Sequence, residues 1–379
     1  MNRAGSYITN MTGEAAYRSF CPSPLPPNPP LELDDDCQQL LINANIELAK
    51  LNVSANLIPS AELFVSMYVR KEALLTSQIE GTQCTLDDIL DPNADENTNL
   101  EVGDVINYIN ASQYAISRLN DLPLCNRLLR ETHKQLMRGV RGEDKNPGEF
   151  RRSQNWIGPH GCALKDARFV PPNVIDMIEA MSDLEKYING DSDLDVLVRA
   201  ALIHYQFETI HPFLDGNGRI GRLLILLYLM EQGLLEKPIL YVSYFLKKNQ
   251  IEYYDRISEV RRSGNYEQWI RFFLEAVCAA SKDALESIYE LTKLHDKNLA
   301  LLPSSRRVKD HVRRLFNYVE QHPIIDIKKT AEALDISFNT AASAVRKLTD
   351  LNILCETTNG ARNRVFAYQA YLDILRKGT

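Results

Sequence analysis

Apolar residues recur at helical spacing along most of the chain. From Ala61 to about Glu80, and again from Val196 to Ile210, they return every three or four residues without a Gly or Pro, which is typical of buried helices. The same spacing predicts further helices over 37–51, 85–90, 100–119, 123–138, 174–188, 223–230, 269–280 and 282–302, and a long helical stretch around 253–254. The pattern therefore predicts an all-α fold.

Residues 148–172 interrupt the helical pattern. Apolar runs around Trp156-Ile157 and Phe169-Val170 flank a turn made of Gly158-Pro159-His160-Gly161, which predicts a β-hairpin. His160 and Cys162 near its tip could form a metal pair, but two ligands without further partners rarely make a site.

The stretch after Pro303-Ser304-Ser305 has an organisation of its own. Helical patterns over 327–334 and 337–348 surround a short turn, as in a helix-turn-helix, and short apolar runs over 353–356 and 364–368 flank residues 359–362 like a two-stranded wing. We therefore predict an N-terminal arm and helical region over 1–99, a core over 100–302 and a winged-helix domain over 303–379.

Charge supports this division. The chain of 379 residues has a net charge of −7, but residues 304–379 carry 13 Lys and Arg against 8 Asp and Glu. This basic segment could bind DNA, for example through Asn339, Arg346 and Lys347, or it could mediate dimers and docking with other proteins, and the sequence leaves these alternatives open. The six prolines between Pro22 and Pro30 predict an extended N-terminal arm.

Cysteines and apolar runs bear on the cellular compartment. Seven cysteines are scattered without a Cys-x-x-Cys pair, which argues against disulfides and a zinc site. No apolar run is long enough to cross a bilayer, and the N-terminus lacks the pattern of a signal segment. We expect a cytoplasmic protein.

The turn between the helices over 196–210 and 223–230 concentrates reactive side chains. His211 can act as a base, Asp215 can bind a hard cation, and Gly216-Asn217-Gly218 can expose the free amides of a helix N-terminus to an anion. Arg219 and Arg222 lie three residues apart, so both could contact phosphate oxygens from one helix face. The turn therefore indicates phosphoryl-transfer chemistry.

A metal centre is the alternative interpretation of this turn. His204 precedes His211 by seven residues and would share its helix face, so a site made of His204, His211 and Asp215 must be considered. That site would leave the Gly-Asn-Gly-Arg sequence without a role, and we consider it the weaker hypothesis.

Residues 211–222, His-Pro-Phe-Leu-Asp-Gly-Asn-Gly-Arg-Ile-Gly-Arg, resemble the signature of the Fic (Fido-fold) family at every defined position. The resemblance implies a helical bundle with a β-hairpin flap that moves AMP from ATP to a protein hydroxyl. It implies that His211 is the base, Asp215 the Mg²⁺ ligand and Phe213 a core anchor. The nucleotide-binding residues that it implies are Gly216, Asn217, Gly218, Arg219, Ile220, Arg222 and, beside the adenine, Tyr254. The related Doc kinases carry Lys in place of Gly218, which favours nucleotide transfer over phosphate transfer.

A second motif lies at the end of the predicted helix over 61–81. Thr76-Ser77-Gln78-Ile79-Glu80-Gly81 is similar to the (Ser/Thr)-x-x-x-Glu-(Gly/Asn) sequence of the family's inhibitory helix. By itself this short pattern would more often be an exposed Glu in a last helical turn. Together with the loop motif, it implies that Thr76 and Glu80 inhibit the site in cis, with Glu80 paired to Arg222.

The resemblance leaves the direction of the reaction and the partners open. The chain would be a protein adenylyltransferase that uses ATP and Mg²⁺ to modify a Ser, Thr or Tyr hydroxyl of a target protein. Alternatively, Glu80 would orient water to remove AMP from a modified protein, or the chain would be a DNA-binding regulator that mainly modifies itself. A flap of this kind holds the target by strand pairing, and homodimers are common in the family.

Overall fold

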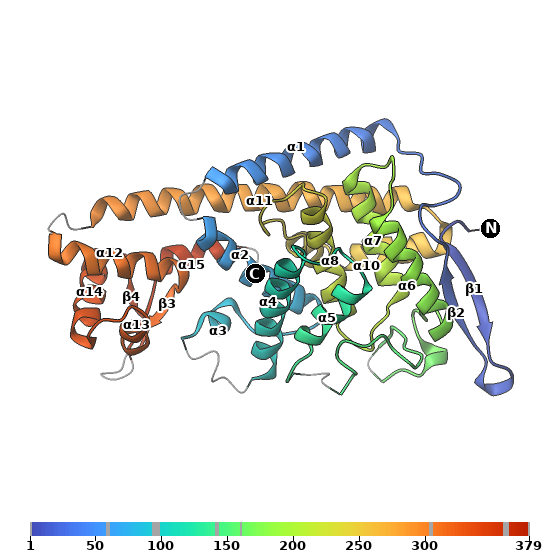
Figure 1. The fold of residues 1–379 in the computed structure, drawn as a ribbon, viewed down its shortest axis with the longest axis horizontal. Coiled ribbons are helices and arrows are strands. Elements are labelled where there is room, and N and C mark those ends of the chain that lie inside the picture. Colours follow the sequence, from blue (N-terminus) through green and yellow to red (C-terminus); the bar gives the residue numbers. More distant parts are fainter. Residues whose placement is uncertain are drawn as a thin grey trace.

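The computed structural model describes residues 2–57, 61–92, 99–140, 144–159, 161–302, 306–358 and 364–377. Its centre is the pair α7 (Val196–Ile210) and α8 (Asn217–Glu231), whose side chains are almost all buried. Helices α4 (Leu100–Arg118), α5 (Asn126–Leu136) and α6 (Val174–Asn189) pack around this pair. The mainly helical fold predicted from the apolar spacing is therefore confirmed (Figure 1).

Two long helices run side by side along the molecule. Helix α1 (Asp35–Leu57) packs against α11 (Tyr266–Leu301), as Figure 1 shows. The prediction of two helices over 269–280 and 282–302 is wrong, because α11 continues through the buried Ser281 without a Gly or Pro to break it. With 36 residues, α11 is about 54 Å long, enough to connect both ends of the molecule.

Helix α2 (Ala61–Ile79) leads towards the centre of the molecule, and α3 (Leu86–Leu90) follows it. The predicted capping pair is present, because Thr85 and Asp88 form a reciprocal capping box at the start of α3. The helical stretch around residues 253–254 is divided into α9 (Ser243–Lys248) and α10 (Gln250–Ser263). Helices α2 and α9 pack against each other.

The N-terminal arm is not simply extended, as its prolines had suggested. Strands β1 (Gly5–Asn10) and β2 (Tyr17–Pro22) form an antiparallel hairpin that projects from the body, with a 3₁₀ turn at Gly13–Ala15 between them (Figure 1). Phe20 of β2 is fully buried and Tyr7 packs edge-on against it at 5.2 Å. This aromatic anchor explains why the arm folds back on itself before the proline segment begins.

The predicted flap over 148–172 contains less strand than expected. Ile157 and Phe169 form one antiparallel bridge, and a 3₁₀ turn at Leu164–Asp166 lies within the connection. The amide of Phe20 donates to the carbonyl of Val170 at 2.9 Å, so the N-terminal hairpin supports the flap from its other side. His160 of the suggested metal pair lies outside the described residues.

Residues 306–377, called the C-terminal domain below, follow α11 and bury Leu315, Phe316, Phe366 and Leu372. Its elements are α12 (Arg306–Gln321), β3 (Ile324–Asp326), α13 (Ile327–Ala333), α14 (Phe338–Asp350), β4 (Cys355–Glu356), β5 (Val365–Ala367) and α15 (Gln369–Leu375). The three strands form an antiparallel sheet in the order β3-β5-β4. Both predicted helices and both predicted strands are present, while residues 359–362 between the strands lie outside the described part.

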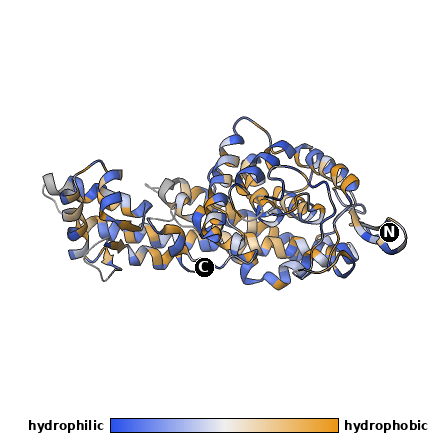
Figure 2. Cartoon of the chain, turned by 90° about the horizontal axis from the view of Figure 1, so that it is seen from below, coloured by the Kyte–Doolittle hydropathy of each residue, from blue (hydrophilic) through white to orange (hydrophobic). Residues whose placement is uncertain are grey.

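Figure 2 shows hydrophobic residues between the helices of the main body and between those of the C-terminal domain, with hydrophilic residues around them. Within the described residues, no helix is both long enough and apolar enough to cross a lipid bilayer.

Candidate active site

His211 ends helix α7 in a left-handed backbone conformation, with φ 51° and ψ 60°. This conformation is uncommon for a residue with a side chain and persists only where neighbours hold it. Two side chains from the flap segment do so, because Arg151 Nε and Asn155 Nδ2 donate to the carbonyl of His211 at 3.0 and 3.2 Å. The base predicted from the sequence thus lies on a fixed turn.

The imidazole of His211 is electrically neutral at physiological pH. Burial lowers its pKa to about 4, and the nearby guanidinium of Arg261 acts in the same direction, while the backbone carbonyl of Glu208 opposes them. A neutral imidazole has a lone pair that can accept a proton. His211 therefore meets the electronic requirement for a general base.

The loop after His211 is closed by its own buried side chains. Asn217 accepts from the amide of Phe213 and donates to its carbonyl, both at 2.8 Å. This pairing commits the buried Asn217 amide to bracing the loop, whereas the resemblance implied contact with nucleotide. Phe213 is fully buried, as expected for a core anchor, and stacks on His133 with 3.8 Å between ring centres.

His133 is a residue of the candidate site that the sequence did not indicate. The amide of Gly148 donates to its Nδ1 at 2.9 Å, so Nε2 must carry the proton that it donates to the carbonyl of Asp215 at 3.0 Å. Burial lowers the pKa of His133 to about 4, which keeps this tautomer uncharged. The position of His133 on the apolar face of the helix predicted over 123–138 was the one sign in the sequence that it would be buried. The sequence around Arg151 and Asn155 gave no such sign.

Helix α8 begins earlier than its apolar run predicted. Gly216 has φ 74°, a conformation that suits glycine, and the first helical residue is Asn217. Gly218 therefore lies in the first turn, where amides without helical partners attract anions. A Cβ atom added to Gly218 would lie 2.2 Å from Oε1 of Glu80. The carboxylate of Glu80 thus lies directly over the helix end that would bind a phosphate.

Glu80 and Thr76 enclose the guanidinium of Arg222. Glu80 Oε1 accepts from Nη2 of Arg222 at 2.6 Å, while Oγ1 and the carbonyl of Thr76 accept from Nε and Nη2 at 2.6 and 3.0 Å. Burial acts to raise the pKa of Glu80, but the charge and hydrogen bond of Arg222 outweigh it and hold this pKa below its usual range. The ion pair that the sequence suggested between Glu80 and Arg222 is present.

Arg219 reaches a different part of the protein. Its Nη1 lies 4.0 Å from Asp104 of α4, and its Nη2 lies 3.9 Å from Asp215 and contacts the sulfur of Met137. The two arginines therefore diverge, although their spacing had placed both on one helix face. Ile220 between them is buried, so only its backbone could contact a nucleotide.

Two family models match the chain. The description "Fic/DOC family N-terminal" matches residues 38–117, and "Fic/DOC family" matches residues 123–229, which include the loop around His211. The chain therefore contains the N-terminal and the Fic domain of the Fic/DOC family. The resemblance stated from the loop motif is thereby confirmed.

Curated relatives share part of this Fic chain. "Protein adenylyltransferase Fic" from Drosophila erecta is 32% identical over 147 residues, which are 38% of this chain and 26% of the relative. The protein of the same name from Drosophila willistoni is 29% identical over 218 residues, 52% of this chain and 39% of the relative. The chain thus spans well under half the length of these relatives.

Solved structures support the fold. A Fic family protein from Desulfovibrio desulfuricans G20 has a TM-score of 0.57 at 18% identity and covers 89% of this chain and 97% of its own. A Fic domain containing signaling protein from Bacteroides thetaiotaomicron has a TM-score of 0.51 at 17% identity, covering 68% and 97% respectively. At these identities the likeness concerns the fold alone.

Two buried carboxyl groups border Arg222 of the Fic loop. Burial raises the pKa of Glu208 to about 7 and that of Glu72 to about 8, although Arg222 lowers both. Ser243 donates to Glu72, whereas Oε1 of Glu208 lies beside Gly221 and has no hydrogen-bond partner among the described residues. The sequence had not identified either group. Arg222 is therefore surrounded by more carboxyl groups than Glu80 alone.

Tyr254 is predicted to lie beside the adenine, and His204 is predicted to take part only in the alternative metal site. Tyr254 lies beside Glu80 and Arg222, and burial followed by the charge of Glu80 raises its pKa to about 12. His204 is fully buried, and its two nitrogens contact Gly221 O and Tyr253 Oη at 2.8 Å each. Both nitrogens of His204 are thus occupied, which argues against the metal site of His204, His211 and Asp215.

Asp215 is suited to share a cation with a phosphate. Its side chain is 48% exposed beside the α8 N-terminus, and its Oδ1 accepts from the amide of Gly216 at 2.6 Å. Across the described ranges, no three His, Cys, Asp or Glu residues group as a metal site would require. One carboxylate combined with phosphate oxygens is, however, the usual way in which proteins hold Mg²⁺, so the donor set fits that ion.

Proposed function

We propose that this Fic protein transfers AMP from ATP to a hydroxyl side chain of a target protein. The observation that carries the proposal is the neutral imidazole of His211, held beside the N-terminus of α8 by Arg151 and Asn155. A base and an anion-binding helix end on one short loop are the two elements that attack on a phosphate needs. The similarity to relatives named adenylyltransferases supports the same assignment.

The proposed transfer balances its atoms without an intermediate on the enzyme. The hydroxyl oxygen forms a bond to the α-phosphorus, its proton passes to His211, and the bond to the pyrophosphate oxygen breaks. The amides of Gly218 and its neighbours would bind phosphate oxygens, and Asp215 would hold the Mg²⁺ that neutralises their charge. Because little covalent chemistry is left to the protein, positioning and charge dominate catalysis.

We further propose that Glu80 keeps the site inactive in the state described above. Its carboxylate lies over Gly218, where a phosphate would bind, and it engages the arginine that would hold the outer phosphates. ATP could then bind only with its phosphates displaced. A displacement of about 1 Å can cost roughly 10²-fold in rate, so the block acts on geometry more than on affinity.

The labelling pattern of ATP tests the transfer. The full chain is incubated with a protein extract and Mg²⁺, using ATP labelled at either the α- or the γ-phosphate, with Glu80→Gly as the active form. Label from the α-phosphate should enter protein and label from the γ-phosphate should not. Entry of γ-label above the level in the extract alone would show phosphate transfer, and entry of neither label above that level would contradict the proposal.

Removal of AMP is the alternative reaction at the same site. It would require Glu80 to orient a water molecule, whereas Oε1 of Glu80 is bound to Arg222. Protein already labelled with AMP separates the two directions: if the wild type releases AMP faster than Glu80→Gly does, removal is the activity of this state.

A second candidate function is binding of duplex DNA through helix α14. Asn339, Ser343 and Arg346 are exposed along it, and neither Lys328, Arg346 nor Lys347 forms an ion pair with any described residue. Cations without carboxylate partners suit a phosphate backbone. Binding of duplex DNA by the full chain should weaken as salt rises, and Arg346→Ala should weaken it further. Absence of binding at low salt would leave α14 to a protein partner.

A further inference from the structure

Helix α2, which precedes Glu80, lies between the helices around α7 and α8 and the C-terminal domain, and its two faces have different partners. The inner face contacts the catalytic core through Glu72 and Thr76, which bind Ser243 and Arg222. The outer face carries Arg70, which donates to the carbonyl of Ser66 on its own helix at 3.0 Å. Helix α2 also packs against α12 and α15 of the C-terminal domain, and α15 lies next to it in Figure 1.

Arg70 marks the contact on the outer face. Its charge acts on Tyr371 of α15 and on His322 just after α12, so its guanidinium lies close to both side chains. No carboxylate forms an ion pair with Arg70 within the described ranges. The middle of α2 is therefore in contact with the C-terminal domain about 15 Å before Glu80, at 1.5 Å per helical residue.

The segment that follows Glu80 is held by the same domain. Arg376, just after α15, donates to both carboxylate oxygens of Asp87 in α3 at 2.8 Å. Lys329 of α13 donates to the carbonyl of Pro92 at 2.9 Å. The C-terminal domain thus contacts the chain on both sides of Glu80 in the sequence.

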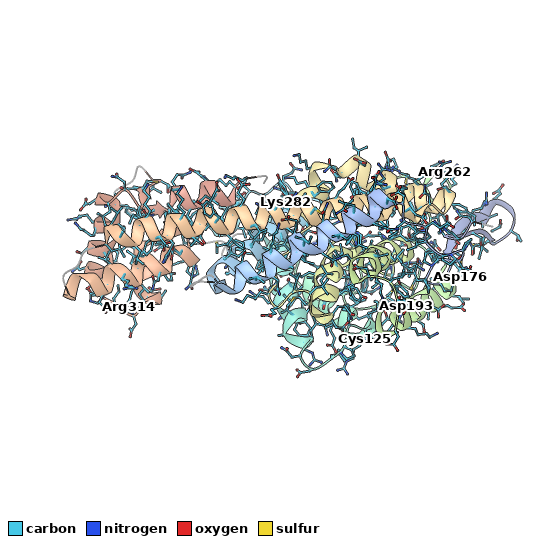
Figure 3. All side chains as sticks on the ribbon, turned by 90° about the horizontal axis from the view of Figure 1, so that it is seen from above. Cys125, Asp176, Asp193, Arg262, Lys282 and Arg314 are labelled. Atoms are coloured by element: carbon cyan, nitrogen blue, oxygen red, sulfur yellow. The ribbon has the colours of Figure 1, made fainter. Side chains whose placement is uncertain are left out.

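Helix α11 forms ion pairs with residues next to or in both α2 and the C-terminal domain. Its Asp283 accepts from Lys71 of α2 at 3.2 Å, and its Glu290 accepts from Lys377 at 2.6 Å. These two acidic residues are seven positions apart and hence on one helix face. Figure 3 shows Lys282 of α11 between the part of the core that contains Asp193 and the domain that contains Arg314.

We infer that the C-terminal domain is a clamp on the helix that carries Glu80. In the docked arrangement, the ion pairs Arg376–Asp87 and Lys377–Glu290 keep the domain against α2 and α3, and these helices keep Glu80 on Arg222. When the domain leaves, the last turn of α2 loses its outer support and Glu80 can move off the phosphate position. The inference rests on the proposed function, because it assigns a regulator to that site.

The energetics favour control from outside the site. Glu80 is held by one carboxylate oxygen, and its side chain is 39% exposed. Because Arg222 is buried, the cost of desolvation offsets much of the attraction within this pair, so its occupancy depends on how well the backbone of α2 is fixed. A partner that binds the C-terminal domain better when it is undocked would shift the population towards the active form.

Charge reversal at the clamp tests the inference in the full chain. Arg376→Glu with Lys377→Glu places like charges against Asp87 and Glu290. If two exposed pairs are lost, AMP transfer should rise by about five- to tenfold. Adding Asp87→Lys and Glu290→Lys forms both pairs again with opposite sign and should return transfer to the wild-type rate. Lys186→Glu, which breaks the remote surface pair with Asp183, is the matched control and should change nothing.

Two further measurements separate this inference from the proposed function. In the Glu80→Gly background, the charge reversal at residues 376 and 377 should not raise AMP transfer further, because the carboxylate that it would release is absent. Amide hydrogen exchange in the last turns of α2 should become faster when the charges are reversed. This measurement does not depend on enzymatic activity. Unchanged exchange and unchanged transfer, with Glu80→Gly fully active, would overturn the clamp alone. An inactive Glu80→Gly would contradict the proposed function. The hydrogen-exchange measurement would still show whether the C-terminal domain holds α2.

Discussion

The loop around His211 and the turn that carries Glu80 meet at Arg222, yet they are held in different ways. Side chains from outside the loop fix its carbonyls, since Arg151 and Asn155 bind that of His211 and His133 binds that of Asp215. Glu80 is fixed by a single contact on a side chain that is 39% exposed, whereas the side chain of Arg222 is 1% exposed. The proposed catalytic groups are therefore held in place whether or not Glu80 is bound, and the proposed block is the part that can be removed.

The largest effect is expected at the base. In the Glu80→Gly background, His211→Ala should reduce AMP transfer by about 10²- to 10⁴-fold, because the attacking hydroxyl loses its proton acceptor. The rate of label transfer measures the effect, and ATP affinity by calorimetry is the control and should change little. Undiminished transfer would show that the fixed loop does not supply the base.

Removal of the carboxylate beside the phosphates should have the next largest effect. Asp215→Ala should abolish the dependence of transfer on Mg²⁺, because Asp215 is the carboxylate that the loop offers to the cation. The measurement is the transfer rate as a function of Mg²⁺ concentration, with the exposed Asp144→Ala as control. An unchanged Mg²⁺ response would assign the cation to another ligand.

The brace of the loop can be weakened without touching its chemistry. His133→Phe retains a ring to stack on Phe213 but leaves the amide of Gly148 and the carbonyl of Asp215 without their partner. An unsatisfied buried group typically costs about 1–3 kcal/mol, so the melting temperature should fall by several degrees. Transfer in the Glu80→Gly background should fall as well, and full activity at reduced stability would show that the brace does not position Asp215.

The pH profile tests the charge state of the base. A group whose pKa is lowered to about 4 is protonated only below that value, so transfer by Glu80→Gly should lose activity as pH falls through about 4. An ordinary imidazole would produce this loss near its usual pKa of 6.5. Glu208, with a pKa of about 7, is a second group that titrates nearby, and Glu208→Gln removes its contribution. A loss near 6.5 that persists in Glu208→Gln would contradict the neutral His211.

Much of the fold and the core of the site could be predicted from local sequence. Helix α7 has the predicted bounds, since an uninterrupted apolar run between Asp195 and His211 leaves little choice. The twelve residues from His211 to Arg222 indicated phosphoryl transfer because base, carboxylate, glycines and arginines are contiguous there. The Glu80–Arg222 contact needed the family resemblance, because nothing in a short last helical turn reveals what it faces.

Other features depend on contacts between distant segments and could not be predicted. The strands β1 and β2 depend on burial of Phe20, and the flap contains one bridge where a longer hairpin was expected. Arg219 diverges from Arg222 because Asp104 of another helix lies within its reach. The roles of His133 and Arg151 likewise arise only when the flap segment folds against the loop.

The most direct test of the proposed inhibition by Glu80 compares AMP transfer by the wild type with that by Glu80→Gly, at equal ATP and Mg²⁺. Removing the carboxylate breaks the ion pair with Arg222 and clears the space over Gly218, so transfer should rise by an order of magnitude or more, and ATP affinity should change much less. Glu80→Gln keeps the size of the side chain but loses the charge, and its rate should lie between the two. Equal transfer by wild type and Glu80→Gly would contradict the claim that Glu80 blocks the site.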